Sequence, residues 1–204
     1  MSELQEIARL VNSCTECSLC EGRTLGVPGE GPEGADLMFI GEAPGYNEDK
    51  QGRPFVGAAG HFLEQLLESI GLTRQQVFIT NMVKCRPPNN RDPLPEEVTA
   101  CRKYLDQQLG LLKPKVVVTL GRHSLTKFLP GESIGRAHGK PRRHGSFILY
   151  PMYHPAAALH QQSLRSVIEE DFKAIPALLA KQVSQDEQGP KTEQEPKAEQ
   201  LSMF

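Results

Sequence analysis

The sequence predicts an α/β domain of three layers (αβα) with a central, mainly parallel sheet of four strands. Short apolar runs alternate along the chain with segments of helical apolar spacing, which is the order of a parallel sheet covered by helices. Polar or glycine-rich segments begin directly after three predicted strands, at residues 41, 81 and 154. Because ligands of such sheets bind at the carboxyl ends of the strands, we expect the functional site at that edge.

The amino-terminal part supplies a short helix, the first strand and the first long helix. Residues 3–11 are typical of a short helix, and residues 36–40 (DLMFI) form an apolar run that ends at Gly41. Residues 59–70 carry apolar side chains at helical spacing. Gly71 follows them, and glycine is favoured directly after a helix. These segments give the first strand–helix pair of the sheet.

The middle of the chain repeats the pattern. Residues 77–80 predict the second strand, and residues 95–112 predict a long helix that starts at Pro95 and has two glutamates in its first turn. Residues 115–120 (KVVVTL) are β-branched and lie between a proline and a glycine, so they predict the third strand.

The last elements are a short helix over residues 122–129, a fourth strand over residues 146–153 and a helix over residues 164–181. Residues 182–204 are rich in Gln, Glu, Lys and Pro, a composition typical of disorder. We therefore expect one folded domain over residues 1–181 and a disordered tail after it.

The net charge of −2 conceals an uneven distribution. Residues 182–204 hold 5 acidic and 2 basic residues, which leaves 21 basic and 20 acidic residues in the remaining 181. No apolar run approaches the roughly 20 residues needed to span a bilayer, and no signal segment opens the chain. We expect no membrane contact and a cytoplasmic location.

Five cysteines suggest a metal site. Cys14, Cys17 and Cys20 form a C-x2-C-x2-C run, and Cys85 and Cys101 follow. In a reducing compartment, metal ligation or catalysis is a better use for such a set than disulfides. Four thiolates suit a structural zinc or an iron–sulfur cluster, and the spacing does not choose between them. The alternative is that Cys85 or Cys101 is a small buried hydrophobic residue.

A loop dense in glycine and proline, residues 41–57, follows the first strand. It is neither a P-loop nor a dinucleotide-binding motif, because it lacks both glycine patterns. Phe55 within it is either a core anchor or a stacking platform for a base. Asn81, after the second strand, offers an amide donor and acceptor or else forms a turn. His154 follows the fourth strand.

The strings GEAPGYNEDKQGRPFVG, TNMVKCRPPNNRDP and YHPAAAL, together with the cysteine spacing, closely resemble the family 4 uracil-DNA glycosylases. The resemblance covers roughly residues 10–180. It implies the uracil-DNA glycosylase superfamily fold, uracil-containing DNA as substrate and a [4Fe–4S] cluster. The implied cluster ligands are Cys14, Cys17, Cys85 and Cys101, which leaves Cys20 without a role.

Excision of uracil requires a base that is flipped out, stacked, recognised along its Watson–Crick edge and released with negative charge. The resemblance implies that Phe55 stacks on the base, Asn81 bonds to O4 and N3–H, and His154 donates to O2. It implies a uracil-binding set of Glu42, Ala43, Phe55, Asn81 and His154 and a catalytic set of Glu42, Glu48, Asn90 and His154.

The carboxylate that orients the attacking water stays open. The best-known branch of the superfamily has an Asp within a GQDPY motif, and Ala43 and Gly45 occupy the positions of its Asp and Tyr here. The resemblance favours Glu42 and Glu48 instead, with Asn90 helping to hold the water. Glu48 as a solvated loop carboxylate is the alternative.

Basic residues cluster in two places. The stretch 135–145 (GRAHGKPRRHG) contains no acid, and Lys84, Arg86 and Arg91 form a second group. We expect both groups on one rim of the sheet, where they would neutralise phosphates. Leu159 lies in a stretch similar to the superfamily's intercalation loop and is either a wedge in the DNA or a core leucine. The predicted DNA-binding residues are Arg86, Arg91, Arg136, Lys140, Arg142, Arg143 and Leu159.

The chain ends with QLSMF, which resembles the pentapeptide by which bacterial repair proteins bind the sliding clamp. The predicted clamp contacts are Gln200, Leu201, Met203 and Phe204. We expect a monomer.

Two other functions remain open: a superfamily glycosylase for other deaminated bases, and a non-catalytic, metal-stapled DNA-binding adaptor. The Arg-rich insertion of a covalent-trapping relative is absent between Cys85 and Pro95.

Overall fold

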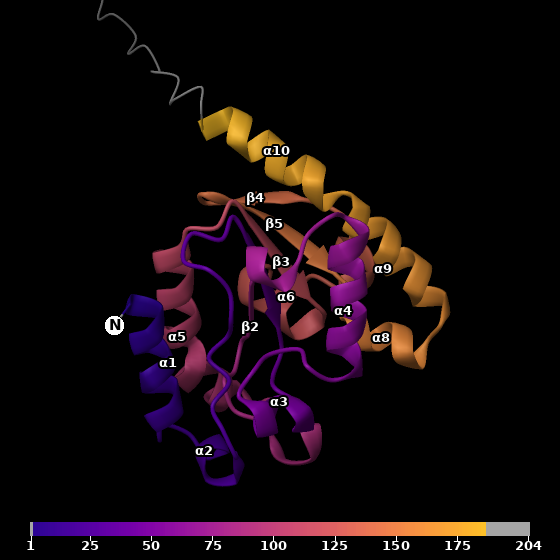
Figure 1. The fold of residues 1–204 in the computed structure, drawn as a ribbon. Helices are drawn as coiled ribbons and strands as arrows, with labels where there is room; N and C mark the ends of the chain where they lie inside the picture. The colour runs from indigo at the N-terminus through magenta and orange to yellow at the C-terminus, as the bar shows by residue number, and fades with distance from the viewer. Residues whose placement is uncertain (1, 187–204) are drawn as a thin grey trace, which may run out of the picture.

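The computed structural model describes residues 2–186 and places five strands in one sheet between two layers of helices (Figure 1). The order across the sheet is β2-β1-β3-β5-β4, and all pairs are parallel except β4 with β5. The strands are β1 (Leu37–Gly41), β2 (Phe78–Asn81), β3 (Val116–Leu120), β4 (Arg142–His144) and β5 (Phe147–Met152).

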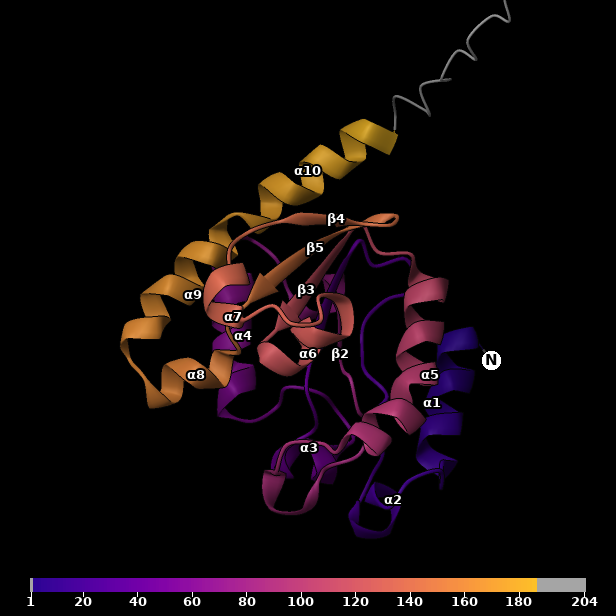
Figure 2. The ribbon, with the colours of Figure 1, turned by 180° about the vertical axis from the view of Figure 1, so that it is seen from behind.

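The helices cover both faces of the sheet. They are α1 (Glu3–Ser13), α2 (Leu19–Gly22), α3 (Tyr46–Gln51), α4 (Ala58–Ser69), α5 (Pro95–Leu112), α6 (Arg122–Phe128), α7 (Ile134–Ala137), α8 (Pro155–His160), α9 (Ser163–Lys173) and α10 (Ile175–Asp186), with the short 3-10 helices η1 (Arg74–Gln76) and η2 (Pro88–Asn90). Consecutive strand residues point to opposite faces. Phe39 belongs to a core cluster with residues of α4, α8, α9 and α10, whereas Ile40 belongs to a second cluster with residues of α5 and α6. Figure 2 shows the arrangement of these helices around the sheet. The predicted αβα class is confirmed.

The chain reverses its direction across the sheet after β2. From β1 it moves outward to β2 at the edge, and it then returns to β3 on the other side of β1. Because crossovers between parallel strands are right-handed, this reversal puts α4 and α5 on opposite faces. Such a reversal opens a crevice at the carboxyl ends of the strands.

Three elements differ from the prediction. The sheet has a fifth strand, β4, in the stretch expected to be a basic loop, because Gly145 (φ 59°) allows a tight turn back into β5. The stretch after His154 forms the helix α8 rather than a loop. The helix expected over residues 164–181 is two helices, α9 and α10, which break at Ala174. Pro176 has no N–H to continue the first of them.

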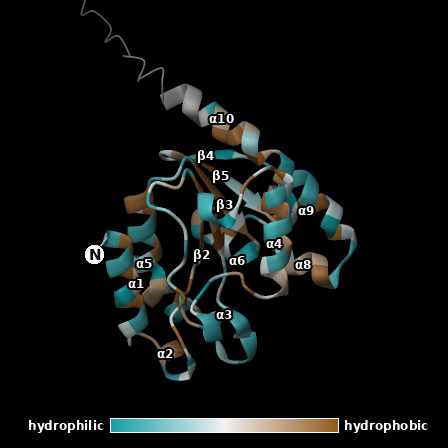
Figure 3. Cartoon of the chain, viewed as in Figure 1, coloured by the Kyte–Doolittle hydropathy of each residue, from teal (hydrophilic) through white to brown (hydrophobic). Residues whose placement is uncertain are grey.

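The core lies along the sheet, and Figure 3 shows the apolar colour concentrated in the central strands while α3 is mostly hydrophilic. Helix α10 continues to Asp186, five residues past the predicted domain boundary. The remainder of the predicted tail, with the predicted clamp contacts Gln200, Leu201, Met203 and Phe204, lies outside the described residues. Within residues 2–186, no helix combines the length and the apolar character that a bilayer span requires.

Candidate active site

A cavity of about 550 Å³ opens at the carboxyl ends of the strands. Its walls come from the loops after β1 and β2, from η2 and from the start of α8. The predicted uracil-binding and catalytic residues all line it, namely Glu42, Ala43, Glu48, Phe55, Asn81, Asn90 and His154. The fold thus brings together residues that are up to 112 positions apart in the chain.

Asn81 is held at the end of β2, directly beside Gly41 in the parallel register. Its side chain is 2% exposed. Among the described residues 2–186, no protein group forms a hydrogen bond with its side-chain amide, which lines the cavity. A Cβ on Gly41 would lie 2.3 Å from Asn81 Oδ1 and 2.7 Å from Phe55 Cζ. The glycine is therefore required for this amide and this ring to face the cavity side by side.

Phe55 serves as both a core residue and a cavity wall. Its ring packs in the main core, as the first alternative predicted, and it also lines the cavity. Its stacking on a base stays a prediction. Its backbone is left-handed (φ 53°), which is strained for a non-glycine residue. Arg74 holds it there, because Nη1 donates to Phe55 O at 2.8 Å and Nη2 donates to Pro54 O at 2.6 Å. Glu30 pairs with the same guanidinium at 2.7 Å.

Glu48 organises the loop between β1 and α4. Its Oε1 accepts the amides of Val56 and Gly57, both at 2.9 Å, and its Oε2 accepts the amide of Gly45 at 3.1 Å. The carboxylate is therefore not the freely solvated group that the sequence left as an alternative. It closes the loop on itself and places Phe55 at the cavity.

His154 presents a neutral N–H donor to the cavity. It caps α8, and its Nδ1 accepts the amide of Ala156 at 3.1 Å, which leaves the ring proton on Nε2. Burial lowers the pKa of His154 to about 4, although the Glu48 carboxylate opposes this shift. The ring stacks on Phe55 with centroids 5.4 Å apart. At neutral pH this side chain donates a hydrogen bond without carrying a charge.

Glu42 belongs to a polar network that the sequence did not predict, in which Arg122 Nε donates to His123 Nε2 at 2.9 Å. His123 Nε2 lies 3.6 Å from Glu42 Oε2 and 3.2 Å from Asp92 Oδ2, and Arg122 Nη2 lies 2.5 Å from Asp92 Oδ2. The pKa of Glu42 is raised, chiefly by burial. His123 and Arg122 oppose this shift, whereas Asp92 adds to it. The position of Arg122 and His123 directly after β3, at the functional edge, was the signal that could have revealed them.

The rim residues Arg86, Asn90 and Arg91 are tied to the protein. Arg86 Nε donates to Asn90 Oδ1 at 2.6 Å, which fixes the predicted water-holding side chain. Arg91 forms a forked pair with the buried Glu97, with distances of 2.6 and 2.9 Å, and it lowers the pKa of that carboxyl. Most of the charge of Arg91 is thereby neutralised within the protein.

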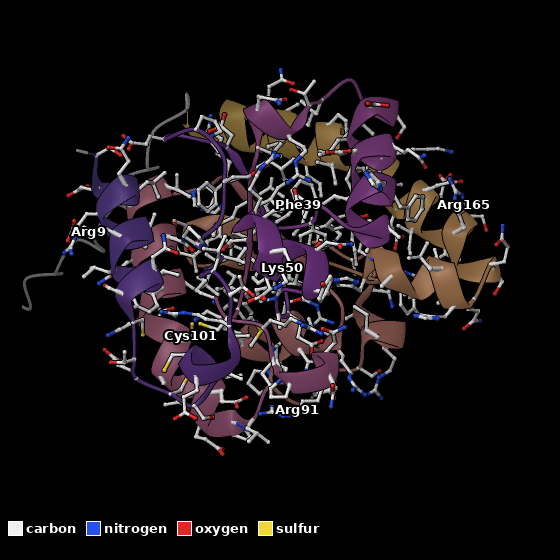
Figure 4. The ribbon with its side chains drawn as sticks, turned by 60° about the horizontal axis from the view of Figure 1, so that its bottom comes forward. Arg9, Phe39, Lys50, Arg91, Cys101 and Arg165 are labelled. Carbon is white, nitrogen blue, oxygen red and sulfur yellow. The ribbon has the colours of Figure 1, made fainter. Side chains whose placement is uncertain are left out.

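The five cysteines surround one small apolar cavity, formed by Cys14, Cys17, Cys20, Cys85 and Cys101. None forms a disulfide, and Figure 4 shows sulfur atoms gathered beside the labelled Cys101. Their gathering argues against Cys85 and Cys101 being merely small hydrophobic residues. Cys20 also lines the cavity, so its position does not set it apart.

The surroundings of the sulfurs fit a thiolate-bound metal group. Arg23 Nη1 donates to Cys85 Sγ at 3.0 Å, and the amide of Lys84 donates to Cys101 Sγ at 3.2 Å. Such N–H bonds stabilise sulfur ligands. Burial raises the pKa of Cys85, and it raises that of Cys101 to about 11. A bound cation would offset this shift by stabilising the thiolates.

The family model of the uracil DNA glycosylase superfamily matches residues 28–175 of this chain. The chain belongs to this superfamily. Several relatives bear the name type-4 uracil-DNA glycosylase. Among them are one from Sulfurisphaera tokodaii (54% identical, covering 86% of this chain and 84% of the relative), one from Saccharolobus solfataricus (47%, 91% and 91%) and one from Thermotoga maritima (42%, 88% and 97%).

The predicted DNA contacts of this superfamily member are only partly gathered on one rim. Arg91 lines the cavity, and Arg86 binds Asn90 on its wall. Helix α7, which carries Arg136, packs near the carboxyl end of β5. Lys140 follows α7. Arg142 and Arg143 lie on β4, where they pair with Leu149 and Ile148 and run away from the cavity edge. The expectation that both basic groups lie on one rim is therefore not met by Arg142 and Arg143.

The exposed fractions of Lys84 and Leu159 test two further expectations. Lys84, predicted to belong to a basic surface group, is 1% exposed and cannot reach a phosphate. Leu159 on α8 is 51% exposed, which excludes the reading as a core leucine and leaves its side chain free beside the cavity.

Proposed function

We propose that this chain is a uracil-DNA glycosylase that binds a flipped uracil, hydrolyses its N-glycosidic bond and leaves an abasic site for base excision repair. The observation that carries the proposal is the cavity in which an unpartnered amide, Asn81, and a neutral N–H donor, His154, both face the space beside Phe55. A non-catalytic DNA-binding adaptor has no need for this arrangement. The names of the relatives support the same activity.

Each group has a distinct role in the proposed reaction. The amide of Asn81 donates to uracil O4 and accepts from N3–H, a pattern that cytosine reverses. As the bond from C1′ to N1 breaks, both electrons leave with the base, and Nε2–H of His154 stabilises the negative charge at O2. A preorganised donor of this kind contributes about 2–4 kcal/mol by analogy with oxyanion donors. Water then adds to C1′, and the proton that it loses passes to the uracil anion, which is released as neutral uracil.

Glu42 is the better candidate for orienting this water. The three amides bound to Glu48 occupy most of its acceptor capacity, whereas Glu42 lines the same cavity and is paired only at longer distance with His123. Asn90 helps to hold the water at the rim. Glu48 acts through the loop that it organises.

The cysteine cavity is proposed to hold a [4Fe–4S] cluster through Cys14, Cys17, Cys85 and Cys101. When bound, the cluster supplies a cross-link between the amino-terminal segment and α5. The proposal further includes a monomer acting on DNA in the bacterial cytoplasm, with DNA contacts from Arg86, Arg91, Arg136, Lys140, Arg142 and Arg143 and with Leu159 as the wedge.

The test is incubation of the purified protein with oligonucleotides that contain uracil, thymine, cytosine or hypoxanthine, followed by alkali. We expect strand cleavage at uracil only, and a brown protein. Cleavage at hypoxanthine instead of uracil would replace the proposal by a glycosylase for other deaminated bases. Binding without any cleavage would favour the adaptor, and a colourless protein that contains zinc would refute the cluster.

A further inference from the structure

Lys84 is a buried lysine for which the proposed reaction has no use. It lies on the segment between Asn81 and Cys85, and its side chain is 1% exposed. A buried ammonium is costly unless each N–H has an acceptor. Nζ donates to Thr80 Oγ1 at 2.5 Å, to Gln108 Oε1 at 2.7 Å and to the carbonyl of Asn81 at 2.8 Å. All three N–H groups of the ammonium are thereby used.

The acceptors of Lys84 are themselves fixed from the opposite side. Thr80 Oγ1 donates to Pro28 O at 3.0 Å, and Gln108 Nε2 donates to the same carbonyl at 2.6 Å. Thr80 is fully buried and Gln108 is 1% exposed. One network thus joins β2, α5 and the segment before β1. A buried polar network with every member satisfied is rigid, because each group loses its partner if another moves.

The backbone of the same segment connects the cavity with the cysteine site. The amides of Met82 and Val83 donate to the carbonyls of Gly41 and Glu42, at 3.0 and 3.1 Å. The next amide, that of Lys84, donates to Cys101 Sγ at 3.2 Å. Three residues, Met82, Val83 and Lys84, separate Asn81 from Cys85. The backbone N–H of each of the three makes a hydrogen bond.

We propose that Lys84 is a positioning residue for Asn81. By holding the carbonyl of Asn81 and the hydroxyl of Thr80, its ammonium fixes the end of β2 and so the direction of the Asn81 amide. This inference rests on the proposed function. It predicts that loss of the ammonium displaces the amide while the rest of the cavity stays in place. A misplacement of about 1 Å at a reacting centre can cost on the order of 100-fold in rate.

The test is a double-mutant cycle with Lys84→Met and Asn81→Ala, measured as single-turnover uracil excision with enzyme in excess. We expect Lys84→Met to slow excision at least ~10-fold in the wild-type background. In the Asn81→Ala background it should change the rate by no more than about twofold, because the residue through which Lys84 acts is gone. Lys84→Gln, which keeps two donors, should recover part of the rate.

Several outcomes would overturn the inference. Equal losses in both backgrounds would show a general structural role, and an unchanged rate in Lys84→Met would show no role. Iron content and melting temperature are measured for each variant, and Lys84→Gln replaces Lys84→Met in the cycle if the latter does not fold. Lys115→Met is the matched control, since Lys115 pairs with Asp36 at the start of β3. Wild-type protein that fails to excise uracil would refute the proposed function itself, independently of Lys84.

Discussion

Gly41 shapes the cavity because it has no Cβ. Its position at the end of β1 puts it opposite Asn81, and the ring of Phe55 closes over it. The sequence predicted a shaped loop from the density of glycine and proline after the strand. It did not reveal that this particular glycine lies against both the Asn81 amide and the Phe55 ring, because that contact depends on register and on the path of a distant loop.

We predict that Gly41→Ala abolishes base recognition while the fold remains. The new Cβ would lie 2.3 Å from Asn81 Oδ1, so the amide has to move. Single-turnover excision should fall at least ~100-fold. Gly110→Ala in α5 is the control, because its Cβ meets nothing within 4 Å and should stabilise the helix by roughly 0.5–1 kcal/mol. Excision by Gly41→Ala at the wild-type rate would contradict this packing.

The lowered pKa of His154 predicts how the stability of the protein depends on pH. Its pKa is about 4 in the fold and about 6.5 in the unfolded chain, so above pH 6.5 both states are neutral and no stability depends on it. Between pH 6.5 and 4 only the unfolded state takes up the proton, and stability falls as the pH falls. From pH 7 to 5, wild type should lose about 1–2 kcal/mol more unfolding free energy than His154→Asn. Equal losses in denaturant titrations would contradict the assignment.

At the scale of elements, the loop between β1 and α4 depends on Glu48. We predict that Glu48→Ala leaves the amides of Gly45, Val56 and Gly57 without their acceptor, at about 1–3 kcal/mol for each amide that stays buried. Excision should fall, by less than in His154→Ala. Hydrogen exchange at the three amides should accelerate. Protected amides in an inactive Glu48→Ala protein would instead show that Glu48 acts directly on the water.

The long elements followed from sequence because their periodicity and end residues agree with their packing. The apolar runs at β1 and β3 and the spacing in α4 belong to this class. Short elements did not follow. Strand β4 forms because it pairs with β5, and its own polar residues do not predict a strand. The break between α9 and α10 depends on one proline, Pro176, within a pattern that otherwise predicts a continuous helix.

At the scale of the molecule, the carboxyl ends of the strands marked the site because the sheet is mainly parallel and the chain reverses its direction across the sheet after β2. Residues recognised by resemblance, such as Asn81 and His154, meet in one cavity as expected. The burial of Lys84 could not be inferred, since a basic residue in a loop carries no signal of which way it points. His123 follows β3 at the functional edge, but its place near Glu42 and Asp92 depends on the path of distant loops. Charge clustering in sequence likewise did not give clustering in space.

The tail makes a prediction for the whole chain. We expect that deletion of residues 200–204 removes co-elution with a bacterial sliding clamp in gel filtration and leaves excision on short oligonucleotides unchanged. The apolar and aromatic side chains of the peptide would supply the contacts with the clamp. Co-elution that persists without these residues would refute the proposed clamp contact.

The central claim is that Asn81 and the neutral His154 act on uracil from two sides of one cavity. The most direct measurement is the single-turnover excision rate of Asn81→Ala and His154→Ala on a uracil-containing oligonucleotide, with the exposed His61→Ala on α4 as control. We predict losses of about 100- to 1,000-fold for the two cavity variants and none for the control. Wild-type rates in both cavity variants would contradict the account.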